Sequence, residues 1–325
     1  MPMRWGMTVP LTGVPLPDHA TVFPALADAG FTDVWSAEVS GTDAFTPLAL
    51  AAAWEPRLRL GTAIAPVFTR GPGLLAMTAA ALAEAAPGRF QVGIGASSPV
   101  VVGDWNSVDF TEPYERTRDM LRFLRIALTG ETVTHDYGTF AVRRFRLERP
   151  PPTPPPILLA ALRPGMLRLA GAAADGVILN WLSVTDVPVV LAETGANRPA
   201  GFEVAARIFL CPTEDTEYAR AIGRRLLTAY LTVPAYAAFH RWLGREPALA
   251  SMWRAWAAGD RKGALAAIPD AVVDELVVHG APAACRDRMA EFAEAGVTVP
   301  VMAVVPPPDL TPRTLPGLLA ALGPG

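Results

Sequence analysis

The residues that could take part in chemistry lie mainly in short glycine-containing stretches behind apolar segments. One of them, GRFQVGIGASSPV at 88–100, runs from an apolar segment into Gly93 and Gly95. A dinucleotide-binding fingerprint requires a further glycine three residues after the second one, and a helix directly behind it. Ser98 stands at that position, and no helical period begins before about Pro113. The stretch therefore argues against a Rossmann-type site and indicates a loop at the end of a strand.

A second stretch, LLAALRPGMLRLAG at 158–171, has the features of a phosphate-binding helix start. Pro164 suits the first position of a helix, and Gly165 lets a ligand approach the backbone. The free N–H groups of such a helix start attract phosphate, and Arg163 and Arg168 lie within a turn of it. An ordinary capped helix explains the same residues equally well, so both interpretations stay open.

Glu38 is the candidate catalytic carboxylate, because it follows an apolar strand and precedes a loop. A group in that place can serve in acid–base catalysis. A solvated loop acid or a helix cap would have the same sequence context. Asp43, or Thr42 beside it, is expected to cap the helix that follows. Arg70 in FTRGPG either meets an acidic cofactor tail or pairs at the surface.

Other chemistries find less support. The histidines and cysteines show no metal-ligand spacing, so no metal site is expected. No serine or cysteine at a strand end has a histidine at a comparable strand end, which argues against a nucleophilic triad. His135 could reach over the strand ends from an expected hairpin, but it is interpreted as uninvolved. Cys211 and Cys285 are expected to be small, buried apolar residues.

The elements that must position these residues alternate regularly. Short apolar strands are followed by segments with helical spacing that stop at glycine or proline. This alternation indicates a parallel sheet covered by helices, and eight strands fit a (β/α)8 TIM barrel. An open doubly wound sheet also alternates, but its nucleotide fingerprint is missing. The expected strands are 4–10, 31–35, 57–64, 90–95, 156–161, 176–181, 203–211 and 298–305.

We expect one domain over residues 1–325, with two insertions in the barrel. Residues 131–155, after the fourth strand, resemble a hairpin followed by a proline-rich connector. Residues 213–280, between the seventh and eighth strands, have a helical pattern. Aromatic residues in this second insertion form a helical cap or subunit contact, or else line a hydrophobic substrate pocket. They are Tyr236, Trp242, Trp253 and Trp256.

The carboxyl ends of barrel strands form the active face in this fold. At those ends the sequence places small residues, amides and one carboxylate. An apolar, lightly charged floor of this kind suits a flat aromatic cofactor that carries the chemistry itself. The strand-end residues are Thr8, Glu38, Thr62 to Ala65, Ala96 to Ser98, Ala160 to Leu162, Asn180 and Trp181.

Several of these motifs together resemble a known group of enzymes. They are RLGTAIAPVFTRGPGLLAMTAAALAEAAPGRFQVGIGASS, then DWN and PYERTRD, then PPPILLAALRPGMLRLAG and ADGVILNW. They are similar to the bacterial-luciferase-like superfamily, and within it to oxidoreductases that use coenzyme F420, an 8-hydroxy-5-deazaflavin. The resemblance covers roughly residues 4–305.

The resemblance implies a set of cofactor-binding residues. A non-prolyl cis peptide at Ala63–Ile64 would form a bulge behind the middle ring of the deazaflavin. The loop after the fourth strand would touch the ribityl chain and its phosphate, and the helix start at 163–166 would hold that phosphate. Glu38 would lie beside the ring, and Asn180 and Trp181 near the ring or tail. The implied cofactor-binding residues are Thr62, Ala63, Ile64, Ala96, Ser97, Ser98, Ala160, Ala161, Leu162, Arg163, Gly165, Met166, Asn180 and Trp181.

Two departures limit what the resemblance implies. The sugar-phosphate dehydrogenases of the family have a histidine directly after the second-strand acid and a glutamate after the fourth-strand glycines. Val39 and Ser98 stand at those positions in this chain. A sugar-phosphate substrate is therefore not expected, and the acid–base assignment of those enzymes cannot be transferred.

The expected activity is F420-dependent hydride transfer to or from a small organic substrate. The alternatives are an FMN-dependent monooxygenase served by a separate reductase, and a non-catalytic flavin-binding relative. The resemblance also implies a homodimer. A net charge of −3 without a basic stripe argues against nucleic-acid binding. The N-terminus resembles no signal peptide and no apolar run would span a membrane, so a cytoplasmic protein is expected.

Overall fold

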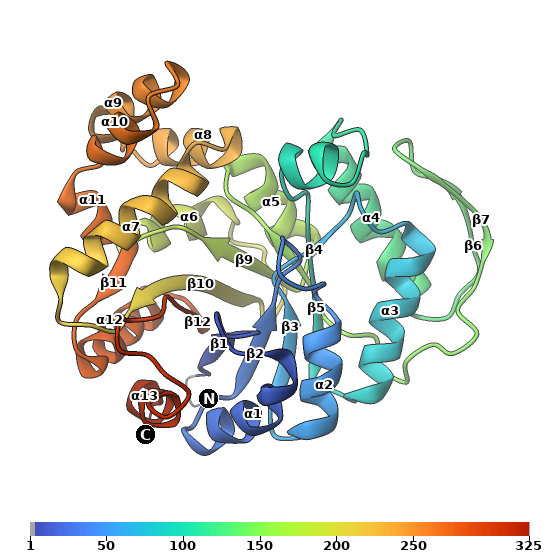
Figure 1. Cartoon of the computed structure of the whole chain (residues 1–325). Helices are drawn as coiled ribbons and strands as arrows, with labels where there is room; N and C mark the ends of the chain where they lie inside the picture. Colours follow the sequence, from blue (N-terminus) through green and yellow to red (C-terminus); the bar gives the residue numbers. More distant parts are fainter. Residues whose placement is uncertain (1–3, 325) are drawn as a thin grey trace.

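The computed structural model describes residues 4–324 and contains a closed barrel of eight parallel strands surrounded by helices (Figure 1). Each strand pairs with the next one along the chain, and the last barrel strand, β12, closes the circle by pairing with β1. The predicted (β/α)8 barrel is therefore confirmed. Its strands are β1 (Gly6–Thr8), β2 (Asp33–Ser36), β3 (Arg59–Thr62), β5 (Phe90–Gly95), β8 (Ile157–Ala160), β9 (Gly176–Asn180), β10 (Glu203–Cys211) and β12 (Val299–Val304).

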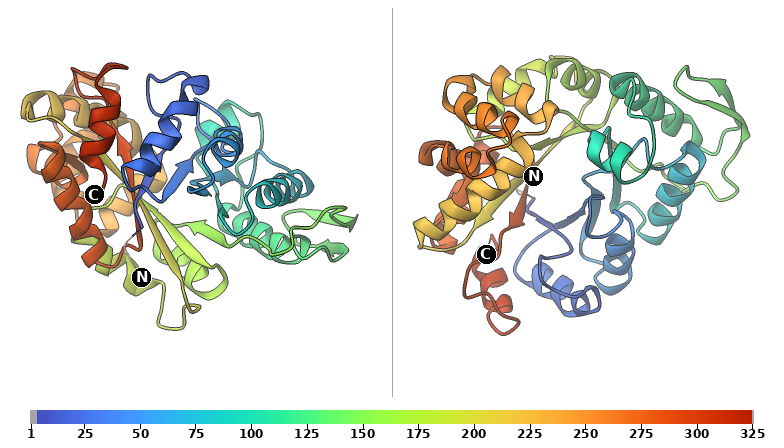
Figure 2. Two further views of the ribbon diagram at one scale, coloured as in Figure 1. Left: turned by 90° about the horizontal axis from the view of Figure 1, so that it is seen from below. Right: turned by 45° about the horizontal axis from the view of Figure 1, so that its top comes forward.

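Helices cover the outer face of the barrel (Figures 1 and 2). Their buried apolar residues join the outward side chains of the strands in one large core. A C-terminal helix, α13 (Leu315–Leu322), contacts α1 and α12. The covering helices are α1 (His19–Asp28), α2 (Thr46–Trp54), α3 (Pro72–Ala85), α4 (Pro113–Ala127), α5 (Pro164–Ala173), α6 (Asp186–Glu193) and α12 (Pro282–Glu294), with short turns η1 (Leu16–Asp18) and η2 (Val100–Asp104).

The barrel interior is filled around one large side chain, Trp35 of β2, which is 1% exposed. Glycines on β1 and β3 make room for it, because a Cβ at Gly61 would lie 2.4 Å from the indole and one at Gly6 would lie 3.1 Å away. Small and branched side chains from the other strands, including Ile178 and Val301, complete this layer. The interior is thus a packed core, as is usual for this fold.

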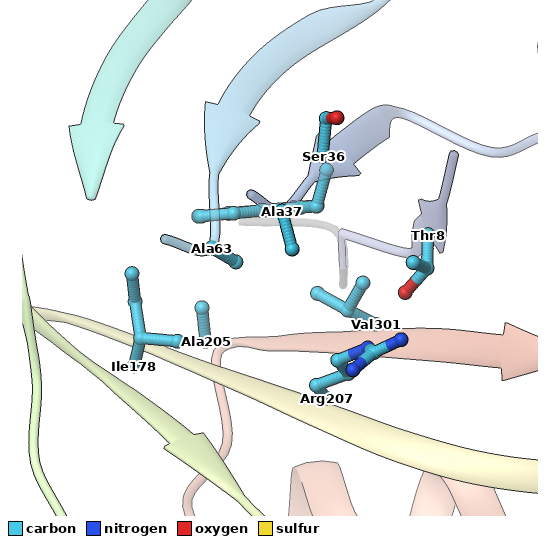
Figure 3. A pocket seen from close by; sticks show the side chains of 9 residues that line it. Thr8, Ser36, Ala37, Ala63, Ile178, Ala205, Arg207 and Val301 are labelled. Atoms are coloured by element: carbon cyan, nitrogen blue, oxygen red, sulfur yellow. The ribbon is translucent and has the colours of Figure 1, made fainter. Parts of the chain in front are cut away.

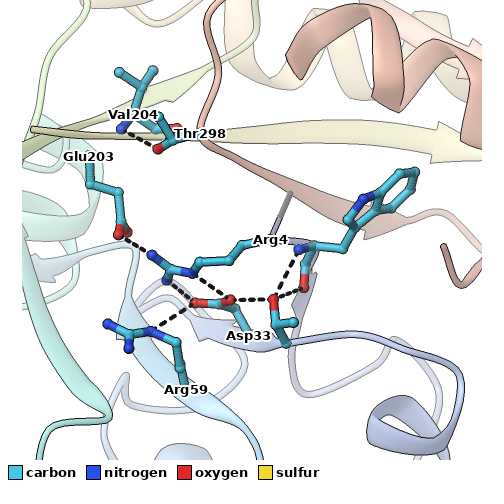
Figure 4. A network of polar contacts seen from close by, with 8 residues as sticks. Arg4, Asp33, Arg59, Glu203, Val204 and Thr298 are labelled. Carbon is cyan, nitrogen blue, oxygen red and sulfur yellow. Dashed lines mark hydrogen bonds and ion pairs between the residues drawn. The ribbon is translucent and has the colours of Figure 1, made fainter. Parts of the chain in front are cut away.

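A polar network closes the barrel at the amino ends of its strands (Figure 4). Arg4 donates to Asp33 on β2 and to Glu203 on β10, while Arg59 on β3 lies 3.9 Å from Asp33. Asp33 is fully buried, so its charge depends on these guanidinium partners. The network joins three strands at the end opposite to the catalytic face of the fold, which indicates a role in stability.

The two insertions lie on opposite sides of the molecule (Figure 1). The first forms the predicted hairpin, β6 (Val133–Asp136) and β7 (Ala141–Phe145), which packs against α4 through Phe123, Tyr137 and Phe140. His135 makes an edge contact with Tyr137 on this outer hairpin, away from the barrel strands. It does not reach over the strand ends.

The second insertion contains the expected helices and one strand that the sequence pattern did not reveal. Strand β11 (Val277–His279) pairs with the end of β10, beyond the point where β9 stops pairing with it. The predicted helical pattern of this insertion is otherwise confirmed, and β11 escaped it because the strand follows α11 without a break and is too short to show a period. The helices are α7 (Thr216–Leu231), α8 (Pro234–Trp242), α9 (Glu246–Ala257), α10 (Arg261–Ala266) and α11 (Asp270–Leu276).

Candidate cofactor and substrate site

Residues of β1, β2, β9, β10 and β12, with the loops behind β2 and β3, line a hollow that we call the barrel mouth (Figure 3). Its enclosed part has a volume of only about 10 Å³, room for roughly one water molecule, and the rest is open to solvent. Its floor combines the top of the Trp35 layer with small residues and one arginine. The lining residues are Thr8, Trp35, Ser36, Ala37, Ala63, Ile178, Ala205, Arg207 and Val301.

A bulge at the end of β3 shapes one wall of the barrel mouth. Gly61 pairs with Gln91, but the next pair along, Ala65 of the short strand β4 (Ala65–Pro66) with Ile94, has moved by one residue. The extra residue marks a β-bulge, and the Ala63–Ile64 peptide inside it is cis, as the resemblance implies. Ala63 therefore faces the hollow.

Thr62 connects this bulge to β5. Its hydroxyl accepts from the Gly93 N–H and donates to the Gly93 carbonyl, each at 2.8 Å. The side chain is fully buried, and its hydroxyl supplies the hydrogen-bond partners for Gly93 that the bulge removes from the β3–β5 pairing. Thr62 thus holds the bulge in place, and its hydroxyl is not free for a ligand.

Beside the bulge, small residues from β5 and β8 make a shallow surface. A Cβ at Gly95 would lie 3.0 Å from both Ala160 and Ile64, so a larger residue would press against these side chains. The loop behind β5 continues through Ala96 to Ser98, half-buried, with Ser97 in the left-handed region at φ 67°. The Ser98 hydroxyl accepts from the Val101 N–H at 3.3 Å. The loop is thus fixed by its own turn.

The start of α5 is open, as a phosphate site requires. No side chain caps its first turn, and a Cβ at Gly165 would meet no atom within 4 Å. Arg163 is exposed, and among residues 4–324 no carboxylate pairs with it. Arg168 instead pairs with Glu193 at 2.7 Å. Ala161, Leu162 and Met166 flank this turn. The first turn of α5 can therefore bind an anion, and Arg163 can provide a positive charge beside it.

Glu38 lies in an ion pair. Its Oε2 accepts from Arg70 at 2.9 Å and from the Ala44 N–H at 3.2 Å, and the Arg70 guanidinium also lies over the Phe45 ring. These contacts join the loop after β2 to the loop after β4. Arg70 therefore pairs within the protein, and its contact with a cofactor tail stays a prediction. Asp43 accepts from the N–H groups at the start of α2, as expected of a cap.

Asn180 and Trp181, adjacent in sequence, have different surroundings. Asn180 donates to the Tyr236 hydroxyl at 2.9 Å, and its own Oδ1 is buried without a partner. The Trp181 indole is 1% exposed and stacks on Phe209 at 4.0 Å, beside Tyr230. It belongs to the core of the second insertion, so only its backbone, at φ 56°, remains near the strand end.

Sequence reasoning missed Arg207, which points into the hollow from β10 (Figure 3). It lies next to Asn180 in the β9–β10 register. A signal was present, because Arg207 is the only charged residue between Glu203 and Cys211 in EVAARIFLC. Tyr236 of α8 was noted only as part of an aromatic group, and the structure brings its hydroxyl to Asn180.

Unpartnered polar atoms gather around the barrel mouth. They belong to Thr8, Trp35, Ser36, Asn180 and Arg207. A buried polar group without a partner costs free energy of about 1–3 kcal/mol, so a cluster of them at one hollow can be satisfied by water or by the polar edge of a ligand. A flat heterocycle with carbonyl and N–H groups on its edge, resting on Ala63, Gly95 and Ala160, fits this arrangement. Its phosphate would fit the start of α5.

Together these features define a TIM-barrel protein with a candidate site at the carboxyl ends of its strands. Residues 4–299 match the family described as luciferase-like monooxygenase. The chain belongs to this luciferase-like family. Among residues 4–324, no helix is both long and apolar enough to cross a membrane.

Three comparisons refine this membership. The chain is 29% identical to a putative coenzyme F420-dependent oxidoreductase of Mycobacterium tuberculosis, over 92% of this chain and 94% of that protein. The fold resembles a coenzyme F420-dependent tetrahydromethanopterin reductase of Methanopyrus kandleri, with a TM-score of 0.75, 20% identity and coverage of 99% and 97%. It also resembles an FMN-bound type II Baeyer–Villiger monooxygenase of Pseudomonas putida, with a TM-score of 0.67, 15% identity and coverage of 100% and 98%.

Proposed function

We propose that this protein is an F420-dependent oxidoreductase that transfers hydride between the cofactor and a small organic substrate. The observation that carries the proposal is the combination of a small-residue surface at the β3 bulge with an uncapped, open α5 start. The relative from Mycobacterium tuberculosis, similar over almost the whole chain, supports the choice of cofactor. When bound, the deazaflavin supplies a carbon centre that accepts or donates hydride.

The residues of this chain would orient the cofactor and exclude water. Ala63, Gly95 and Ala160 would support the ring, because none of them carries a side chain that stands above the surface. The α5 start with Arg163 would hold the phosphate. The Glu38–Arg70 pair would keep two mouth loops together. We propose that Glu38 has this positioning role in addition to the predicted role in proton transfer.

FMN is the second candidate cofactor, with a monooxygenase reaction fed by a separate reductase. The open α5 start favours neither cofactor, because both carry a phosphate, and the Pseudomonas putida neighbour binds FMN. A third candidate is a non-catalytic flavin-binding relative. Hydride transfer in a single turnover would exclude it.

Equilibrium titration of the apoprotein with F420 and with FMN, followed by tryptophan fluorescence, tests the proposal. We expect a micromolar or lower Kd for F420 and much weaker binding of FMN. Arg163→Met should weaken both by removing the phosphate cation, whereas Arg168→Met, whose guanidinium pairs with Glu193, serves as the matched control. Preference for FMN would overturn the proposal and turn the search to oxygen consumption with a reductase.

We also propose that the chain works as a cytoplasmic homodimer. Leu74 and Met77, one turn apart on α3, are about half exposed, at 50% and 51%, and this adjacent apolar pair would suit a protein contact. Light scattering coupled to size exclusion should give twice the mass of the 34.4 kDa chain. A monomer at micromolar concentration would contradict the expectation.

A further inference from the structure

Arg207 is a charged side chain inside the barrel mouth without a charged partner. Within residues 4–324, no carboxylate oxygen lies within 4 Å of its guanidinium, and its Nε is buried without a hydrogen bond. The guanidinium carbon lies 4.5 Å from the centre of the Phe209 ring. Arg207 as a whole is half-buried, and even partial burial of an arginine favours a charged partner, because desolvation of an unpaired charge is costly. The missing partner is therefore an anion that enters the hollow.

The groups around Arg207 are neutral and can donate hydrogen bonds. Asn180 is its register neighbour on β9, and the Asn180 amide donates to the Tyr236 oxygen, which leaves the phenol hydrogen free. Burial raises the pKa of Tyr236 to about 12, so the phenol keeps its proton at neutral pH. The Thr8 hydroxyl faces the same hollow (Figure 3). One fixed cation among neutral donors matches an anionic oxygen group.

Arg207 stands apart from the proposed phosphate site. The α5 start follows β8, whereas Arg207 is on β10, with β9 between them. Neighbouring strands lie about 4.8 Å apart, so the two anion sites are separated by roughly 10 Å or more. A cofactor phosphate at the α5 start would leave Arg207 to another anion. The planar guanidinium fork fits a carboxylate, which it can bind through two parallel hydrogen bonds.

We propose that Arg207 binds a carboxylate of the substrate, so that the enzyme acts on organic acids. The inference depends on the proposed function only for the kind of reaction that the acid undergoes, because the carboxylate-binding site is formed by residues of the barrel mouth itself. Arg207 then determines specificity. A neutral substrate of the same shape would leave the guanidinium desolvated and unpaired, and would bind more weakly.

The test uses benzoate as the probe and benzamide as its neutral counterpart, with binding measured by calorimetry on the full chain with and without F420. We expect benzoate to bind at least tenfold more tightly than benzamide. Arg207→Met should remove this preference, and Arg207→Lys, which keeps the charge but loses the fork, should retain part of it. Arg168→Met is the matched control, because it removes an arginine that pairs with Glu193 outside the barrel mouth and should leave benzoate affinity unchanged.

The outcomes separate this inference from the proposed function. If benzoate binds no better than benzamide, or equally well to Arg207→Met, the carboxylate site is refuted. If Arg207→Met weakens F420 binding tenfold and leaves benzoate unaffected, Arg207 belongs to the cofactor and the inference is again refuted. If the wild-type chain fails to bind F420, the proposed function fails, and the measurements without F420 still decide the carboxylate site. Circular dichroism of each variant verifies the fold, and Arg207→Lys provides a second reading if Arg207→Met is unstable.

Discussion

Replacing Thr62 by valine should destabilise the barrel by more than its small change in shape suggests. Valine has nearly the same volume but lacks the hydroxyl that serves both backbone groups of Gly93 at 2.8 Å. The Gly93 N–H and carbonyl would then be buried without partners, at about 1–3 kcal/mol each. The additional buried methyl returns about 1 kcal/mol. We expect a net loss of about 3 kcal/mol in the free energy of unfolding.

Urea unfolding followed by tryptophan fluorescence and circular dichroism measures this loss. The matched control is Thr62→Ser, which keeps the hydroxyl and loses only a methyl, at a cost of about 1 kcal/mol. With an unfolding entropy of about 2.1 cal/mol/K per residue, 3 kcal/mol corresponds to a fall in Tm on the order of 4 °C. If the valine and serine variants were equally stable, Gly93 would have found other partners, and the role given to Thr62 would be wrong.

Three further predictions concern the barrel filling, the loop ion pair and pH. Gly61→Ala should lower the free energy of unfolding by about 1–3 kcal/mol, because the new methyl group would lie 2.4 Å from Trp35. In a Trp35→Phe background, urea unfolding should show at most half of this loss. If the loss were the same in both backgrounds, the indole would not be the obstacle. If the Glu38–Arg70 pair acts by holding the two loops together, Glu38→Gln and Arg70→Met should lower turnover by the same factor, and the double variant should show no further loss. If only Glu38→Gln lowers turnover, Glu38 acts in proton transfer instead. Burial, then the nearby Arg245 charge, lower the pKa of His240 to about 4 from 6.5. As the pH falls, the unfolded state therefore binds a proton at His240 before the folded state does. The contribution of His240 to stability is fully present above about pH 6.5, and the free energy of unfolding falls by about 3 kcal/mol as the pH drops to 4. His240→Phe should make the free energy of unfolding less dependent on pH in this range, and an unchanged dependence would assign it to other groups.

Local pattern was enough to predict the barrel. Its strands are short apolar runs between helix-ending glycines and prolines, and that signal needs no knowledge of the contacts between distant residues. The hairpin at 131–155 was recognisable for the same reason. Strand β11 was not, because its three residues follow α11 directly and owe their conformation to pairing with β10.

The sequence by itself determined the order of strands and helices, the position of the strand-end loops and the resemblance that points to a deazaflavin. These depend on residue type and spacing within short segments. Only the tertiary structure decided which way each strand-end side chain turns. It paired Glu38 with Arg70, which is 32 residues away, and turned the Trp181 indole into the second insertion. It also left Arg207 in the barrel mouth without a carboxylate within ion-pair distance in residues 4–324. The physical reason is that each polar or aromatic side chain can contact several partners remote in sequence, and the partner it contacts is determined only when the closed barrel brings these residues together.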